Sequence, residues 1–367
     1  LPDALQRIDL EALPHLAAAN PDTSPPFVFA LDELTENLEH LAGDKASNLA
    51  VLSKRLGLPV PTGLVITARA YHYFIEYNGL RPEIESRLAV LDIDSHSSLD
   101  ETSSVLMNLL MQATFPRDLE LAVMEYRDRL FEGERCAVRS SGIGEDGKIS
   151  FAGQYRTVLN TATEGVMDAC KEVYASRYSP TALSYRIRNG LLDEETPMAV
   201  LVMRMVDAEA SGILYSKDPF GLQPDRMKIY STWGVGEPLV EGAAAPDVTE
   251  ISTDGSLRLL AMERAVRDRK SILSREKGTQ SVPLEDGEKK GMSLDEEGAR
   301  RLAGWAERLE SFFGTPVDME WCRDRRGELF ILQCRPLRLD TFSINLELAR
   351  APRVPNRMLI SKGEKAS

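Results

Sequence analysis

The stretch VDMEWCR (317–323), DRRG (324–327), ELFILQCR (328–335) carries the clearest fold signal in the chain. Two runs of mostly apolar residues flank a short polar turn that ends in glycine. Such an arrangement is typical of a β-hairpin. We therefore predict an antiparallel pair of strands here, and its alternation decides which side chains share a face.

Side chains along a strand point to opposite faces in turn. The first strand is expected to place Asp318 and Glu320 on one face and its apolar residues on the other. One face of the second strand is expected to carry Leu329, Ile331, Gln333 and Arg335. With the turn centred near residues 325–327, Gln333 falls roughly opposite Glu320.

This polar face has the chemistry of a magnesium and phosphate site. The Glu320 carboxylate and the Gln333 amide oxygen are hard oxygen ligands of the kind that Mg²⁺ takes beside phosphates and water. Arg335 offers a two-pronged donor for a phosphate, and Asp318 a further acid for the metal. From the residues alone, the alternative interpretation is an ordinary hairpin whose polar side chains face water.

Lys45 stands at the start of a predicted helix over residues 45–56, which Gly57 ends. A lysine at a helix N-terminus opposes the helix dipole, and a bound phosphate would remove that conflict. A solvated lysine remains the alternative.

Arg139 ends the predicted strand Cys136–Arg139, just before a serine- and glycine-rich loop over 140–153. Its guanidinium and the backbone N–H groups of the loop could converge on an anion. Strand-end arginines without such a role are as common. The four histidines lack metal-ligand spacing and are interpreted as structural.

The order of elements predicts a mixed α/β chain in four parts. We expect an N-terminal arm over 1–26, an α/β unit over 27–195, a strand-rich unit over 196–340 that begins at Thr196-Pro197, and a linker over 341–367. Residues 267–298 are polar and charged, and are expected to form a long connection into a helix near 294–313.

Composition narrows the classes of partner. The 367 residues are 43% hydrophobic and 28% charged, with a net charge of −13, so no basic footprint for nucleic acid is evident. No apolar run approaches the length of a membrane span, and we expect a cytoplasmic protein. Four widely spaced cysteines indicate reduced, buried thiols.

Five ordered motifs resemble those of the phosphoenolpyruvate synthase and pyruvate phosphate dikinase family. The first two are DKASNL (44–49) with GLPVPTG (57–63), and CAVRSS (136–141) with ED (145–146) and SFAGQ (150–154). The other three are RMV (204–206) with SG (211–212), WGVGE (233–237), and DMEW (318–321) with LQCR (332–335). The resemblance covers residues 27–337.

The resemblance implies an ATP-grasp fold, with ATP between two α/β lobes. It implies that Lys45 and Arg139 contact the nucleotide phosphates, that Glu320 and Gln333 bind Mg²⁺, and that Arg335 reaches the transferring phosphate. The backbone of Met203, Met205 and Val206 is expected at the adenine edge, and Glu237 among the other nucleotide contacts. Two positions depart from the family: Met203 replaces a glutamine, and Asp44 replaces a glycine.

In this family ATP phosphorylates a histidine on a swivelling downstream domain, which passes the phosphoryl group on toward pyruvate. The segment 358–367 resembles the lead-in to that domain, so the expected partners are ATP and a phosphohistidine domain absent from this sequence. Two alternatives stay open: another acceptor, as in the rifampicin phosphotransferases, and a nucleotide-sensing module without catalysis.

Overall fold

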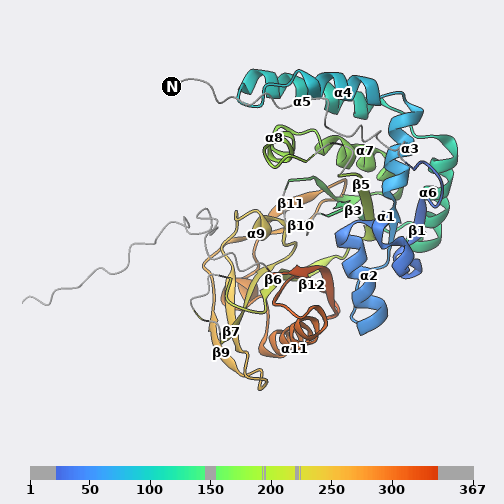
Figure 1. Cartoon of the computed structure of the whole chain (residues 1–367). Coiled ribbons are helices and arrows are strands. Elements are labelled where there is room, and N and C mark those ends of the chain that lie inside the picture. Colours follow the sequence, from blue (N-terminus) through green and yellow to red (C-terminus); the bar gives the residue numbers. More distant parts are fainter. Residues whose placement is uncertain are drawn as a thin grey trace, which may run out of the picture.

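A computed structural model describes residues 22–144, 154–191, 193, 196–219, 223 and 225–337. Most of the expected N-terminal arm, the 341–367 segment and residues 145–153 of the expected 140–153 loop lie outside these residues. Two large antiparallel sheets, a separate two-stranded hairpin and the helices packed on them build the described part (Figure 1). The predicted mixed α/β class is confirmed.

The first sheet has five strands in the order β1-β2-β5-β3-β4. They are β1 (Val28–Ala30), β2 (Gly63–Ile66), β3 (Cys136–Gly142), β4 (Thr157–Thr161) and β5 (Met198–Arg204). The expectation that a second unit begins at Thr196 is wrong for β5, which lies between β2 and β3. The continuous apolar run of β5 suits a central strand of the first sheet, because the side chains on both faces of the strand are buried.

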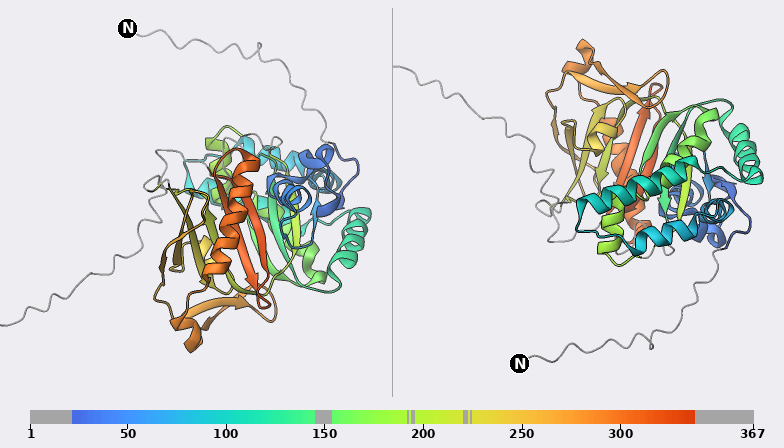
Figure 2. Two further views of the ribbon diagram at one scale, coloured as in Figure 1. Left: turned by 90° about the horizontal axis from the view of Figure 1, so that it is seen from below. Right: turned by 90° about the horizontal axis from the view of Figure 1, so that it is seen from above.

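Helices from the first half of the chain cover one face of this sheet (Figure 2). Side chains from both form one apolar core, which includes Leu64, Phe74, Leu106 and Val202. The helices on this side are α3 (Ala68–Tyr77), α4 (Arg81–Ala89), α5 (His96–Gln112), α6 (Arg117–Phe131), α7 (Val166–Ser176) and α8 (Pro180–Arg188). Shorter turns are η1 (Leu31–Glu33), η2 (Glu36–Leu38), α1 (Glu39–Ala42) and η3 (Thr163–Gly165).

The second sheet has six strands in the order β13-β12-β6-β7-β8-β9. They are β6 (Ala208–Tyr215), β7 (Arg226–Trp233), β8 (Asp247–Ser252), β9 (Leu259–Glu263), β12 (Val317–Asp324) and β13 (Leu329–Pro336). The long helix α11 (Glu296–Phe313) packs on one face, as the left view of Figure 2 shows. Two short helices, α9 (Glu237–Val240) and α10 (Asp286–Lys290), complete this half.

The expected long connection over 267–298 is only partly correct. It contains a separate hairpin of β10 (Arg269–Leu273) and β11 (Thr279–Pro283) before α10 and α11. Its strands are mostly half-buried or exposed, so they lack the apolar alternation by which a strand is recognised in sequence.

Helix α2 (Asp44–Leu56) contacts both sheets, through β3 of the first and β13 of the second. The predicted helix is confirmed, and Gly57 ends it in the left-handed conformation with its N–H bonded to the carbonyls of Leu52 and Ser53. The apolar side of α2 joins residues of both sheets, such as Leu201 and Met319, in one continuous core. All four cysteines are free and buried, as expected.

Candidate functional site

The terminal hairpin forms as predicted, with one irregularity that shapes the site. Glu320 pairs with Gln333, and Trp321 pairs with Ile331, so the register skips Leu332. This β-bulge puts Ile331 in the apolar core and Gln333 on the polar face. The expectation that Ile331 and Gln333 share a face is therefore wrong, because strict alternation does not survive an extra residue.

Arg139 reaches this hairpin from the first sheet. Its Nη2 donates to Glu320 Oε2 at 3.0 Å and to Gln333 Oε1 at 2.8 Å. Its Nη1 donates to the carbonyl of Leu332, the bulged residue, at 2.7 Å. The remaining Nε is buried without a hydrogen-bond partner among the described residues.

The prediction that Arg139 ends its strand is wrong. Strand β3 continues to Gly142, since residues 140–142 keep pairing with the start of β5. The serine-rich motif is thus still strand where it meets α2, and the loop begins later than its composition indicates.

Lys45 lies in the first turn of α2, and its Nζ donates to Ser140 Oγ at 3.3 Å. The same turn is fixed to β3 by a bond from the Ala46 N–H to Ser141 Oγ at 3.1 Å. Gly43 permits this close approach, because it has φ +73° and a Cβ there would lie 1.9 Å from the Ser141 carbonyl oxygen. Lys45 is consequently held at Ser140, the residue that follows Arg139 in β3.

Arg335 and Asp318 form a pair one register step along the hairpin. Arg335 Nε and Nη2 donate to Asp318 Oδ2 at 3.0 and 2.8 Å. Burial raises the pKa of the Asp318 carboxyl, and the Arg335 guanidinium only partly opposes this rise. Tyr215 of β6 pairs with Asp318 across the sheet, and burial together with the Asp318 charge raises the pKa of its phenol.

The six predicted residues, the charged cluster, fall into three sets of contacts. Arg139 bonds to Glu320 and Gln333, Arg335 bonds to Asp318, and Lys45 bonds to Ser140. The cluster holds three cations and two carboxylates, and the Asp44 carboxylate stands next to Lys45 in the first turn of α2. Guanidinium and ammonium groups are the side chains that bind phosphate in proteins.

The other predicted residues lie elsewhere. The Met203 side chain is packed in the apolar core, 2% exposed. Met205 and Val206 follow the end of β5, and the Met205 N–H donates to the carbonyl of Arg135. Glu237 begins α9 and accepts a bond from the Thr279 hydroxyl at 2.9 Å.

Several side chains near this cluster form contacts that the sequence did not predict. Asn48 of α2 donates to the carbonyl of Cys334 at 3.1 Å, which fixes the helix to β13. The carboxylate of Asp44, which departs from the family pattern, accepts from the Gly144 N–H at 3.2 Å. Hydrogen bonds between segments so far apart in the chain leave no local pattern in the sequence. The place of Tyr215 beside Asp318 follows only from the pairing of β6 with β12.

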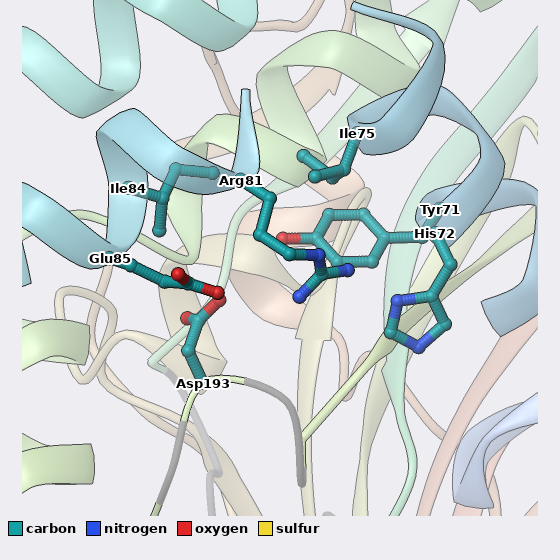
Figure 3. Close-up of a pocket in the computed structure, with 7 residues that line it drawn as sticks. All are labelled: Tyr71, His72, Ile75, Arg81, Ile84, Glu85 and Asp193. Atoms are coloured by element: carbon teal, nitrogen blue, oxygen red, sulfur yellow. The ribbon is translucent and has the colours of Figure 1, made fainter. Parts of the chain in front are cut away.

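A small cavity of about 30 Å³ lies apart from this cluster, among α3, α4 and Asp193. Figure 3 shows the Arg81 guanidinium between the Tyr71 ring and the carboxylates of Glu85 and Asp193. Burial acts to raise the pKa of Asp193, but Arg177 and Arg186 outweigh it and hold that pKa well below its usual range. The cavity has room for roughly one or two waters, and we interpret the ion pairs around it as structural.

The decisive comparison is with protein families. The family model of the pyruvate phosphate dikinase AMP/ATP-binding domain matches residues 39–345, most of the chain. The chain belongs to this family. The residues that the family model matches include the whole charged cluster of this pyruvate phosphate dikinase AMP/ATP-binding domain.

The relatives of this dikinase-family domain include phosphoenolpyruvate synthases and rifampicin phosphotransferases. The chain is 32% identical over 321 residues to a probable phosphoenolpyruvate synthase of Methanocaldococcus jannaschii, covering 86% of this chain and 27% of the relative. It is 34% identical over 343 residues to the phosphoenolpyruvate synthase of Aquifex aeolicus, covering 86% and 40%. It is 31% identical over 315 residues to the rifampicin phosphotransferase of Bacillus subtilis, covering 84% and 36%.

The chain thus spans 27% to 40% of the length of these curated relatives. Among solved structures, D-alanyl-alanine synthetase A from Vibrio cholerae covers 65% of this chain and aligns with 54% of its own, at 11% identity and a TM-score of 0.27. So low a score carries no argument. No helix in the described ranges is both long and apolar enough to cross a membrane.

The cluster of this dikinase-family domain has a donor set that suits a magnesium ion. Glu320 Oε2 and Gln333 Oε1 both lie within 3.0 Å of one Arg139 nitrogen, so the two oxygens face the same cationic group. Across the described part of the chain, no three or more His, Cys, Asp and Glu side chains gather as a metal cage. Two protein oxygens, completed by phosphate and water, match the way Mg²⁺ binds in nucleotide sites.

Proposed function

We propose that this chain is the ATP- and magnesium-binding part of a phosphoenolpyruvate-synthase-like phosphotransferase. The single observation that carries the proposal is the contact of Arg139 in the first sheet with Glu320 and Gln333 in the second. It brings a cation and two metal-type oxygens from distant parts of the sequence to one place. Membership of an AMP/ATP-binding domain family supports a nucleotide as the ligand.

In the proposed complex, the triphosphate lies at the meeting point of the two sheets. Lys45 and Arg139 bind phosphate oxygens, and Arg335 binds the phosphate that is transferred. Glu320 and Gln333 hold Mg²⁺, with Asp318 beside them. When bound, the metal ion neutralises phosphate charge and orients the phosphates for transfer.

Positioning and neutralisation of charge supply most of the catalysis of phosphoryl transfer. The residues of the cluster provide both functions, and none of them needs to act as a nucleophile. We propose that the phosphoryl group goes to a histidine of a downstream domain and from there toward pyruvate. The chain covers less than half of each phosphoenolpyruvate synthase it resembles, so that acceptor belongs to the remainder of such a protein.

A second acceptor chemistry is favoured by one observation. The rifampicin phosphotransferase of Bacillus subtilis matches this chain about as well as the phosphoenolpyruvate synthases do. The same nucleotide-binding part would serve either acceptor, so the cluster does not distinguish them. A nucleotide-sensing module without catalysis is the third possibility, and transfer to an added phosphohistidine domain separates it from both.

The first test is calorimetric titration of the chain with ATP, with and without Mg²⁺. We expect Glu320→Ala to remove the benefit of magnesium, and Lys45→Ala to weaken binding roughly tenfold to a hundredfold through loss of a charge-assisted contact. Melting temperatures should stay close to that of the wild type.

Two matched variants serve as controls. Glu83→Ala removes an exposed carboxylate that pairs with Arg87, and Lys54→Ala removes a lysine of α2 that donates to the Leu34 carbonyl. Neither should change nucleotide binding. Magnesium-dependent binding that survives Glu320→Ala would contradict the site, as would equal losses in the control and test variants.

A further inference from the structure

The hairpin β10–β11 connects the two sheets at a second place, away from Arg139. In the middle of β10, the Ser271 carbonyl accepts from the Val235 N–H at 2.8 Å, beside the end of β7 in the second sheet. At its tip, the Gly278 N–H donates to the carbonyl of Leu159 in β4 of the first sheet at 3.0 Å. Figure 1 shows the hairpin between the two halves of the molecule.

Asn160 holds the tip. Its side-chain amide donates to the carbonyls of Ser274 and Gly278, at 2.7 and 2.9 Å. The residue is fully buried and has φ +53°, a left-handed conformation that asparagine tolerates better than most residues. A buried amide in this conformation that satisfies two carbonyls of another segment is a specific connection between the sheets.

Arg135 fixes the orientation of Asn160. Its Nε donates to Asn160 Oδ1 at 2.6 Å, and its Nη2 donates to the Asn160 carbonyl at 2.7 Å. The Oδ1 atom is thus occupied by Arg135, which leaves the NH₂ group directed at the hairpin. Lys277 adds an ion pair from the tip to Glu172 on α7.

The hairpin is also joined to two residues that the family resemblance implies at the nucleotide. It reaches Met205 through Asn160 and Arg135, because the Arg135 carbonyl accepts from the N–H of Met205. It reaches Glu237 directly, because the Thr279 hydroxyl of β11 donates to Glu237 at 2.9 Å. On that implied assignment the hairpin lies at the adenine end of the proposed site, whereas Arg139 and Glu320 mark the phosphate end.

We infer that hairpin β10–β11 is a clasp that closes the adenine end of the nucleotide site, and that release of Asn160 must precede nucleotide exchange. This inference rests on the proposed function for its ligand, but the clasp itself rests only on the contacts above. Asn160 is a positioning residue: it acts through the hairpin and not on the phosphates.

Asn160→Asp is the sharpest variant. Aspartate keeps the shape, tolerates the left-handed backbone and still accepts from Arg135, but it cannot donate to the two carbonyls. Its charge would also face two carbonyl oxygens. Asn78→Asp is the matched control, because the Asn78 amide likewise donates to two carbonyls, those of Phe74 and Thr114, at the end of α3.

The first measurement is hydrogen exchange of the hairpin in the whole chain without nucleotide. In Asn160→Asp we expect the amides of the tip, including Gly278, to exchange at least about tenfold faster, while Asn78→Asp leaves them unchanged. Lys277→Glu, which opposes Glu172 without touching Asn160, should act in the same direction more weakly. Unchanged protection in both hairpin variants would overturn the clasp.

The second measurement is the dissociation rate of a fluorescent methylanthraniloyl-ATP with Mg²⁺ in stopped flow. We expect release several-fold faster in Asn160→Asp and unchanged in Asn78→Asp, by loss of a gating contact. Faster hairpin exchange with an unaltered release rate would overturn the gating role. Failure of the wild-type chain to bind the probe would instead count against the proposed function, and the exchange data would still decide whether the clasp exists.

Discussion

Arg139 occupies the position where the proposed magnesium ion would bind. Its Nη2 contacts both oxygens that we assign to the metal, Glu320 Oε2 and Gln333 Oε1. A guanidinium and a divalent cation cannot share two oxygens at such short range, because their charges repel each other. Binding of the metal therefore requires Arg139 to move, and the phosphates of a nucleotide offer it a new partner.

This competition predicts opposite effects of one substitution. In Arg139→Met, binding of Mn²⁺ alone should tighten, on the order of tenfold, because Glu320 loses its resident cation. Binding of magnesium ATP should weaken by a similar factor or more, because the phosphates lose a donor. Electron paramagnetic resonance of Mn²⁺ and calorimetry of ATP measure the two effects separately.

Arg129→Met is the control, since Arg129 forms an exposed pair with Glu33. It should change neither affinity. If Arg139→Met leaves Mn²⁺ binding unaltered or weaker, Arg139 does not compete with the metal, and its contact with Glu320 has only a structural role.

Helix α2 is the element that positions the cluster. It carries Lys45 in its first turn and bonds to β13 through Asn48, so its place between the sheets decides where the lysine points. Gly43 makes that place available, because any side chain there would collide with the Ser141 carbonyl. A glycine with positive φ also ends the helix, at Gly57, but no other atom lies within 4 Å of its Cβ position.

The two glycines predict unequal costs for the same substitution. Gly57→Ala should lower the free energy of unfolding by about 1–2 kcal/mol, the cost of alanine in the left-handed conformation. Gly43→Ala adds a collision with backbone and should cost at least about 3 kcal/mol, and also weaken nucleotide binding. Urea denaturation measures both, and equal costs would argue against close packing of α2 on β3.

The whole molecule has a core that crosses from one sheet to the other. Leu201 of the first sheet, Leu49 of α2 and Trp321 of the second sheet belong to one buried cluster. Apart from this core, Arg139 joins the two sheets directly, and Asn160 joins the first sheet to the hairpin β10–β11. We expect the sheets to unfold together, since unfolding of either one would expose the core that they share.

Calorimetry should accordingly show a single unfolding transition, and ligand should move all of it. At a concentration of magnesium ATP one hundred times the dissociation constant, stability should rise by about 2.7 kcal/mol, with a correspondingly higher melting temperature. ATP without the metal should have a smaller effect. Two resolved transitions, of which only one responds to the nucleotide, would show that the shared core does not couple the sheets.

Local patterns in the sequence determine much of this protein. The alternation of 317–335 predicted a hairpin with Glu320 opposite Gln333, and the glycine at position 57 predicted the end of α2. Those features depend on neighbours in sequence, whose geometry is set by strand and helix periods. The family motifs also named Arg139, Glu320 and Gln333, which the structure brings into contact.

Only the tertiary structure decided how distant segments meet. It placed β5 inside the first sheet, skipped Leu332 in the hairpin register, and continued β3 through the serine motif. It also revealed the hairpin β10–β11 and its bond to Asn160. Each of these depends on pairing between residues far apart in the chain, and such pairing is selected by the packing of the whole core, which no local periodicity encodes.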